Sequence, residues 1–283
     1  MQTLTQIKDI LESRGLAPKR SLGQNFLVDH NLIRKLVDAS GVGRGDLVLE
    51  VGPGTGTMTE ELLARGCEVV ACELDDGLAD HLRDHFGAEI GAGRMTLVHG
   101  DCLAGKHAVN PEILRALGGR PFSLVANLPY GAGTPLMSAL LVDHPECGVL
   151  AVTIQREVAD RLLARHGSKE FGPLAVIAQA AAEVSRVASA PPECFWPRPE
   201  VTSSMALVRR RAAPRGDLRR LSDFCRVAFA HRRKQLGSVL DKSVDWAGVA
   251  RRPGLEGVRP TDRAEGLSIE QLIGLSEAVP VHG

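Results

Sequence analysis

Four consecutive residues, Asn127, Leu128, Pro129 and Tyr130, follow a short apolar run that predicts a β-strand. They suit chemistry at the exocyclic amine of adenine, which is a poor nucleophile because its lone pair is delocalised into the ring. The Asn127 side-chain oxygen and a main-chain carbonyl in the turn fixed by Pro129 can each accept one amine hydrogen, which favours the positive charge that develops on nitrogen. Tyr130 can stack on the base. No metal or covalent nucleophile is required; the structural alternative is an Asn-Pro turn with a packing tyrosine.

A glycine-rich loop, GPGTG at Gly52–Gly56, directly follows the predicted strand Leu47–Val51. Its glycines permit a tight turn and the close approach of a ligand to the backbone. Glu73 ends the next predicted strand, where a carboxylate can bond both hydroxyls of a ribose, and Asp101 ends the third, where it can accept from an adenine amino group. The GxGxG spacing differs from the GxGxxG of dinucleotide-binding proteins and disfavours nicotinamide. Each acid could instead be a helix cap or a surface charge, which is the commoner case for a lone aspartate after a strand.

These residues need a sheet to bring them together. Short β-branched runs alternate with helix-length segments from Asp46 to about Leu207, which predicts an α/β fold with a parallel sheet. The predicted strands are Leu47–Val51, Glu68–Cys72, Met95–His99, Ser123–Ala126 and Val149–Ile154, with Leu174–Val187 and Ser203–Val208 as a closing pair. The predicted helices are Met58–Arg65, Gly77–Phe86, Pro111–Leu117, Pro135–Leu141 and Glu157–Arg165.

After Val208 the sequence becomes basic, and three later segments have helical periodicity without strands: Leu221–Ala230, Lys234–Leu240 and Ile269–Ala278. We therefore expect a domain boundary near Ala212, with residues 1–212 in one domain and 213–283 in a helical one. The net charge of the chain is zero, so a nucleic-acid surface has to come from local clustering. Such a cluster runs from Arg209 to Lys234, although a run of arginines is also typical of a solvated face.

Six cysteines form no CxxC pair and no zinc spacing, which favours free thiols in a reduced compartment. The first residues lack the pattern of a signal peptide, and no apolar run is long enough to span a bilayer. We expect a cytoplasmic monomer that binds neither a membrane nor a metal.

In several stretches the chain resembles the ribosomal RNA adenine N6,N6-dimethyltransferases of the bacterial KsgA/RsmA type. These stretches are LGQNFL (Leu22–Leu27), LEVGPGTGTMT (Leu49–Thr59), CELD (Cys72–Asp75), GDCL (Gly100–Leu103), NLPY (Asn127–Tyr130), SKEFGPLAV (Ser168–Val176), FWPRPEV (Phe195–Val201), FAHRRKQL (Phe229–Leu236) and RAEGLS (Arg263–Ser268). The resemblance implies a Rossmann-like class I methyltransferase sheet followed by a small all-helical C-terminal domain.

The resemblance also implies functional roles. The target is two adjacent adenines in a hairpin near the 3′ end of small-subunit ribosomal RNA, each dimethylated during ribosome maturation. Phe195 matches a second aromatic that encloses the flipped base opposite Tyr130. Arg232, Arg233 and Lys234 become phosphate contacts of the RNA. The residues expected to bind S-adenosyl-L-methionine are Asn25, Leu27, Gly52, Gly54, Glu73, Asp101 and Asn127.

The chain departs from this family directly after Tyr130. Gly131-Ala132-Gly133 stands where the family carries a polar or aromatic residue, an isoleucine and a small hydroxyl residue, and Glu200 replaces a lysine. Two alternatives stay open. One is a large-subunit ribosomal RNA adenine methyltransferase of the antibiotic-resistance type, which shares the glycine loop and NLPY; the other is a weakly active ribosome-assembly or RNA-binding factor on the same fold. The RAEGLS segment favours the small-subunit target.

Overall fold

The structure is a computed structural model that describes residues 1–231, 233–240 and 244–279. Its contacts divide the chain into two compact units. Unit 1 contains residues 1–140, 144–159 and 185–209, and unit 2 contains residues 141–143, 160–184 and the described residues from Arg210 on. Unit 2 therefore includes an internal segment as well as the C-terminal helices. The domain boundary near Ala212 stays a prediction.

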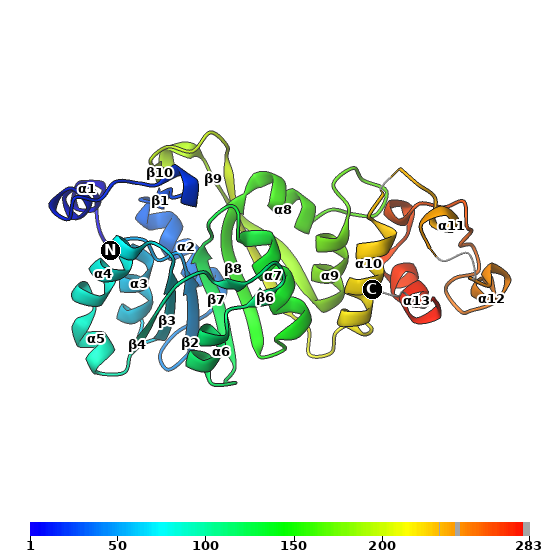
Figure 1. The fold of residues 1–283 in the computed structure, drawn as a ribbon, viewed down its shortest axis with the longest axis horizontal. Helices are drawn as coiled ribbons and strands as arrows, with labels where there is room; N and C mark the ends of the chain where they lie inside the picture. The colour runs from blue at the N-terminus through cyan, green and yellow to red at the C-terminus, as the bar shows by residue number, and fades with distance from the viewer. Residues whose placement is uncertain (232, 241–243, 280–283) are drawn as a thin grey trace. The chain divides into compact units, whose positions relative to one another are not determined.

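The central sheet contains seven strands, which Figure 1 shows between two layers of helices. They are β2 (Leu47–Val51), β3 (Glu68–Glu73), β4 (Met95–His99), β7 (Phe122–Asn127), β8 (Cys147–Gln155), β9 (Ala182–Ala190) and β11 (Ser203–Arg210). Their order in the sheet is β4, β3, β2, β7, β8, β11, β9. The first five in this order run parallel, and β11 runs antiparallel to β8. The predicted α/β fold with these five parallel strands is confirmed.

The strand order reverses at β2, which pairs with β3 on one side and with β7 on the other. In open α/β sheets, ligands bind in the crevice outside the carboxyl ends of the strands at such a switch point. The glycine loop follows β2, and Asn127 ends β7. The topology therefore brings the glycine loop and Asn127 to the same edge of the sheet.

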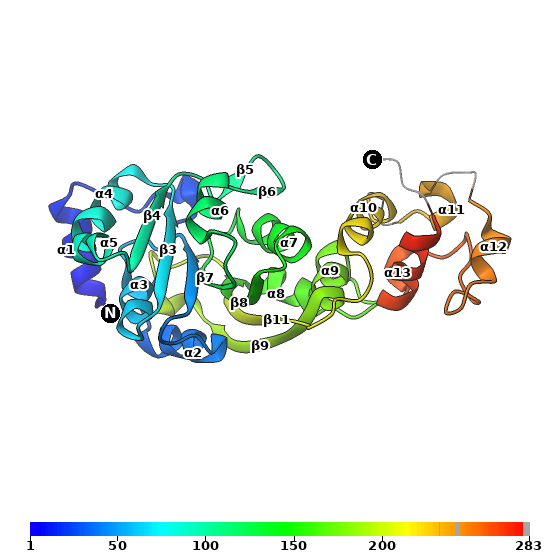
Figure 2. The ribbon, with the colours of Figure 1, turned by 90° about the horizontal axis from the view of Figure 1, so that it is seen from below.

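Helices cover both faces of the sheet. On one face α2 (His30–Ser40), α3 (Thr57–Ala64) and α4 (Asp76–His85) contribute to one buried apolar cluster with the strands. Figure 2 shows α6 (Pro111–Leu117) and α7 (Gly133–Asp143) on the opposite side from α2 and α3. All five residues of β2 are buried, as expected for a strand covered on both faces.

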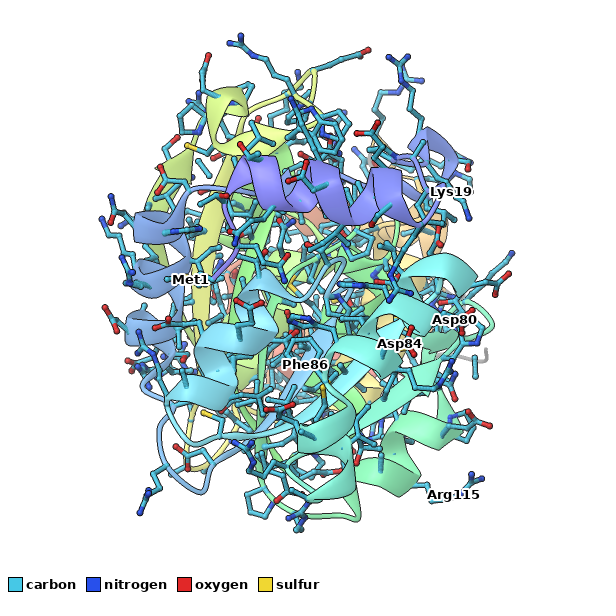
Figure 3. The ribbon with its side chains drawn as sticks, turned by 90° about the vertical axis from the view of Figure 1, so that its left-hand side faces the viewer. Met1, Lys19, Asp80, Asp84, Phe86 and Arg115 are labelled. Atoms are coloured by element: carbon cyan, nitrogen blue, oxygen red, sulfur yellow. The ribbon has the colours of Figure 1, made fainter. Side chains whose placement is uncertain are left out.

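The N-terminal segment packs over the end of unit 1. Helix α1 (Leu4–Ser13) begins with a capping box in which Thr3 and Gln6 bond each other's backbone, and it buries Ile7 and Leu11. Figure 3 shows this helix crossing between the labelled Met1 and Lys19. Behind it, β1 (Phe26–Leu27) pairs antiparallel with β10 (Phe195–Trp196). This pairing carries the LGQNFL segment to the switch point of the sheet.

One predicted strand was wrong. The segment Leu174–Val187, predicted as a strand, forms helix α9 (Pro173–Ala181) before β9 begins. Every residue from Leu174 to Ala181 except Gln179 is buried, so the apolar run shows no helical periodicity. Pro173 at the first helical position and the alanines that follow favour the helix.

The C-terminal part of unit 2 is helical, as predicted. Helices α9, α10 (Leu218–Ala228) and α13 (Ile269–Ala278) pack together. The expected helix Lys234–Leu240 is only one turn, α11 (Leu236–Val239), and α12 (Trp246–Ala250) was not predicted. Among the described residues, no helix is both long and apolar enough to cross a membrane. The remaining helices and strands are α5 (Gly87–Gly91), α8 (Arg156–Leu162), β5 (Leu103–Ala104) and β6 (Ala108–Val109).

Candidate active site

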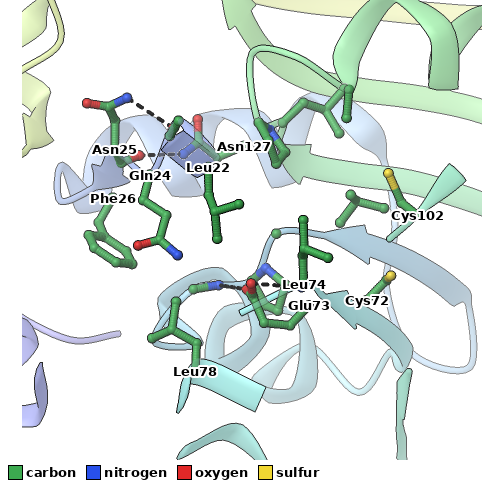
Figure 4. A pocket seen from close by; sticks show the side chains of 18 of the residues that line it. Leu22, Gln24, Asn25, Phe26, Cys72, Glu73, Leu74, Leu78, Cys102 and Asn127 are labelled. Atoms are coloured by element: carbon green, nitrogen blue, oxygen red, sulfur yellow. Dashed lines mark hydrogen bonds between the residues drawn. The ribbon is translucent and has the colours of Figure 1, made fainter. Parts of the chain in front are cut away.

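A cavity of about 470 Å³ lies in unit 1 at the switch point of the sheet, a size typical of a cofactor pocket. Its wall comes from the N-terminal segment, the glycine loop and the ends of β3, β4 and β7. Figure 4 shows Asn25 and Asn127 on one side of it and Glu73 and Leu78 on the other. The predicted residues that line it are Asn25, Leu27, Gly52, Gly54, Glu73, Asp101, Asn127, Leu128, Pro129 and Tyr130.

The glycine loop has a backbone that other residues would strain. Gly54 and Gly56 have φ angles of +63° and +92°. A Cβ on Gly54 would lie 2.8 Å from the Phe26 ring, and one on Gly56 would lie 2.5 Å from the Phe86 ring. These contacts bring the loop against aromatic side chains from two other segments. The loop therefore requires glycine at both positions and presents its backbone to the cavity.

Glu73 is a buried carboxylate of the cavity wall, with only 5% of its surface exposed. One of its oxygens accepts a hydrogen bond from the Gly54 N–H at 3.1 Å, and the other accepts from the N–H groups of Leu74 and Asp75 at 2.9 Å each. Burial raises the pKa of Glu73 above its usual range, and the three backbone donors oppose that rise. The bonds fix the position of the carboxylate at the carboxyl end of β3.

Asp101 lies at the end of β4 and is exposed. Its Oδ1 accepts a hydrogen bond from the Leu103 N–H at 2.9 Å. Two thiols, Cys72 and Cys102, line the same part of the cavity. Burial raises the pKa of both thiols, that of Cys102 to about 12, so they are protonated near neutral pH and form an apolar wall rather than a nucleophile.

The amide of Asn127 has a defined orientation. Its Nδ2 donates to the main-chain carbonyl of Asn25 at 2.9 Å, while the Nδ2 of Asn25 donates to the carbonyl of Gly23 at 3.1 Å. The donor end of Asn127 is thus used inside the protein, and its Oδ1 is available as an acceptor on the cavity wall. The Pro129 carbonyl accepts from the N–H groups of Ala132 and Gly133, which closes the turn at the start of α7.

The two predicted aromatic residues lie in different environments. Tyr130 lines the cavity, and its hydroxyl oxygen lies 3.0 Å from the Oγ of Ser203. Phe195 lies opposite Leu27 in the two-stranded ladder and packs in the main apolar cluster, with 4% of its surface exposed. It is not on the cavity wall. The structure therefore brings Tyr130, but not Phe195, to the cavity.

The predicted phosphate contacts belong to unit 2. Arg233 and Lys234 are exposed in the loop between α10 and α11. Arg232 lies outside the described residues. Within the described chain, no three histidine, cysteine or acidic side chains are placed to share a metal ion.

Several polar residues of the cavity wall were not predicted, and Glu50 and Gln24 are two of them. Glu50 is the one charged residue of β2, accepts a hydrogen bond from the Thr59 hydroxyl at 2.6 Å, and has its pKa raised by burial to about 8. A lone acid inside an apolar strand was the signal that could have identified it. Gln24 donates to Asp75 at 3.1 Å, and Asp75 also forms an ion pair with Lys19 at 2.7 Å. These contacts fasten the N-terminal segment beside the cavity.

Comparison with known proteins agrees with this geometry. The family model described as "Ribosomal RNA adenine dimethylase" matches residues 15–279. The chain belongs to this family. It is therefore an S-adenosylmethionine-dependent methyltransferase that acts on adenine in ribosomal RNA, and the family identified from the sequence is confirmed.

Curated relatives match over nearly the whole chain. The ribosomal RNA small subunit methyltransferase A of Mycobacterium tuberculosis is 39% identical over 284 aligned residues, which cover 96% of this chain and 86% of the relative. The protein of the same name from Phenylobacterium zucineum is 38% identical, with 98% and 94% covered.

Solved structures support the fold. A dimethyladenosine transferase from Plasmodium falciparum matches with a TM-score of 0.67 at 20% identity, covering 87% of this chain and 94% of that one. The 23S rRNA methyltransferase ErmE matches with a TM-score of 0.66 at 25% identity, covering 90% and 99%. The predicted Rossmann-like class I methyltransferase fold with a helical C-terminal part is thereby confirmed.

Proposed function

We propose that this protein dimethylates two adjacent adenines in a hairpin near the 3′ end of small-subunit ribosomal RNA. The observation that carries the proposal is the fixed orientation of the Asn127 amide, whose Nδ2 donates to the Asn25 carbonyl on the wall of a cavity that the buried carboxylate of Glu73 also lines. The names of the curated relatives support the small subunit as the target. The likeness to ErmE makes large-subunit RNA the alternative target for the same site.

Glu73 and Asp101 suit the two polar parts of the nucleoside of S-adenosylmethionine. The cavity fits such a group, because Glu73 offers a buried acceptor for ribose hydroxyls and Asp101 offers an acceptor for the adenine amine. We assign the remaining contacts to Gly52 and Gly54 of the loop and to Asn25, Leu27 and Asn127. When bound, S-adenosylmethionine supplies an electrophilic methyl group on a positively charged sulfur.

Asn127 is the residue to which we assign activation of the target amine. Its Oδ1 accepts one N6 hydrogen, and the Leu128 carbonyl accepts the other, because the Pro129 carbonyl is already used within the turn. Both acceptors stabilise the positive charge that develops on nitrogen as the new bond to carbon forms. Fixed positions of the groups around the amine lower the entropic cost of reaching the reactive geometry.

We assign aromatic and cationic residues to RNA binding. Tyr130 stacks on the flipped adenine from the cavity wall. Phe195 is kept as the predicted second aromatic, and contact with a base requires its ring to leave the apolar cluster. Arg232, Arg233 and Lys234 are assigned to RNA phosphates.

One assay tests the proposal. The protein is incubated with labelled S-adenosylmethionine and immature small subunits, large subunits or naked ribosomal RNA, and the methylated nucleotides are mapped. We expect N6,N6-dimethyladenine at two neighbouring positions of small-subunit RNA. Methylation confined to large-subunit RNA would transfer the activity to the alternative target, and tight RNA binding without methylation would indicate an assembly factor.

A further inference from the structure

We propose that Ser203 is a positioning residue that holds the ring of Tyr130 in the orientation needed to receive the target base. The inference rests on the proposed function, because it takes Tyr130 as the stacking partner of that base. Its physical basis is the hydroxyl contact of 3.0 Å between Tyr130 and Ser203. The two residues are 73 positions apart in the chain and meet at the carboxyl end of the parallel strands.

Ser203 is a rigid support. Its side chain is fully buried, and it lies at the first position of β11 opposite Gln155. The preceding residue, Thr202, accepts a hydrogen bond at its carbonyl from the Arg156 N–H at 3.0 Å. The backbone on both sides of Ser203 is therefore tied to the end of β8, and burial leaves its side chain little space in which to move.

Tyr130 needs such a support because the chain that follows it offers none. Gly131 has no side chain, and an added Cβ there would meet no atom within 4 Å. Ala132 and Gly133 bond the Pro129 carbonyl through their N–H groups, which fixes the backbone but not the direction of the tyrosine ring. The hydroxyl contact with Ser203 supplies that direction.

Ser204 provides a matched control. It is the next residue of the same strand, is 1% exposed and has the same hydroxyl, which donates to the carbonyl of Ala188 at 3.3 Å. Neighbouring residues of a strand point to opposite faces, so Ser204 faces away from Tyr130. Replacing either serine with alanine removes one buried hydroxyl and one hydrogen bond. Only the change at Ser203 affects the tyrosine.

The test compares single-turnover methylation by four variants: Ser203→Ala, Ser204→Ala, Tyr130→Phe and the double Ser203→Ala/Tyr130→Phe. We expect Ser203→Ala and Tyr130→Phe each to slow the reaction by about 3- to 10-fold, the range of one hydrogen bond. The double variant should be no slower than either single one, because both changes remove the same contact. Ser204→Ala should react at the wild-type rate, and all four should bind S-adenosylmethionine equally.

A spectroscopic measurement reports the contact without any turnover. The chain contains a single tyrosine, so 3-fluorotyrosine gives one fluorine NMR signal from position 130. We expect this signal to move in Ser203→Ala and to stay in place in Ser204→Ala. An unmoved signal in Ser203→Ala overturns the contact. If the signal moves but Ser203→Ala and Tyr130→Phe react at the wild-type rate, the positioning role is overturned. It is also overturned if the signal moves and the rate losses of the two single variants add up in the double variant.

Failure of the proposed function gives a different result. In that case the wild-type protein does not methylate small-subunit RNA, and the variants are compared on whichever substrate it does methylate. If Ser203→Ala fails to fold, Tyr130→Phe removes the same bond while keeping the buried serine. A wild-type rate in Tyr130→Phe would then decide against the inference by itself.

Discussion

The two sides of the cavity are held by different kinds of interaction. On the side of the glycine loop, Glu73 accepts three backbone hydrogen bonds, and Gly54 and Gly56 fit closely against aromatic rings. On the other side lie residues 127–133, which we call the catalytic turn after their proposed role. Here single hydrogen bonds hold the Asn127 and Tyr130 side chains, and the next residue, Gly131, lies beside open space. Changes on the first side should therefore affect folding and cofactor binding, whereas changes on the second should affect the rate of transfer.

The largest effect is expected for Asn127→Ala. The change removes an acceptor whose interaction strengthens as charge grows on nitrogen, so we expect transfer to slow by about 10²- to 10³-fold with the protein folded and the cofactor bound. Single-turnover methylation with saturating S-adenosylmethionine measures the loss. Near-normal turnover would mean that the turn is structural and that another group activates the amine.

A glycine of the loop gives the next largest effect. In Gly56→Ala the new Cβ meets the Phe86 ring in a backbone conformation that alanine rarely adopts. We expect the free energy of unfolding to fall by about 2 to 4 kcal/mol. Urea denaturation measures it. An unchanged midpoint would show that the loop is less constrained than the catalytic turn and would reverse the comparison.

Removing the carboxylate of Glu73 should weaken the binding of S-adenosylmethionine. Glu73→Ala deletes charge-assisted hydrogen bonds of roughly 1.5 to 3 kcal/mol, so we expect S-adenosylmethionine to bind about 10- to 100-fold more weakly. Glu73→Gln is the control for folding, since it keeps an acceptor for the backbone donors of Leu74 and Asp75. Unchanged affinity of both variants in calorimetry would place the ribose elsewhere.

A charge reversal in unit 2 should leave both sides of the cavity intact. Arg233→Glu combined with Lys234→Glu should weaken RNA binding and flatten its salt dependence, by a slope of about 0.7 for each phosphate that the protein no longer neutralises. Cofactor affinity should not change. Arg34→Glu with Lys35→Glu is the matched control, because it reverses an adjacent exposed arginine and lysine on α2. Equal salt slopes in the two double variants would identify residues 233 and 234 as an ordinary solvated face.

The smallest effect is expected at Gly131, the counterpart of Gly56. Its φ is not in the left-handed region and a Cβ has free space, so Gly131→Ala should fit without strain. We expect the free energy of unfolding to rise by about 0.4 to 1 kcal/mol, because alanine restricts the unfolded chain. Thermal denaturation beside Gly56→Ala measures the contrast, and a clear loss of stability would contradict it.

Much of the site was predictable because several of its residues lie at the ends of predicted strands. Glu73, Asp101 and Asn127 each follow an apolar run, and parallel strands deliver such residues to one edge of the sheet. Helix α9 was missed because its residues are buried nearly all round, so no helical period was visible.

Contacts made through the main chain were not predictable either. The bond between Asn127 and Asn25 uses the Asn25 carbonyl, which every residue type carries, so no side chain marks it. Phe195 was expected near the base from its motif alone, and its burial depends on β10 pairing with β1, two strands of two residues each. Such short strands carry too little sequence pattern to be recognised.

The pairing of β1 with β10 has a consequence for how the protein becomes active during synthesis. Asn25, whose carbonyl accepts a hydrogen bond from the Asn127 amide, directly precedes β1, and β1 pairs with residues 195 and 196. A growing chain that has produced the glycine loop and residues 127–133 can hold the N-terminal segment through Asp75, which contacts Gln24 and Lys19, but it still lacks β10 and its pairing with β1. The pairing that places β1 is therefore complete only after about two thirds of the chain has been synthesised, so a shorter nascent fragment contains Asn127 and Tyr130 without the strand that pairs with β1.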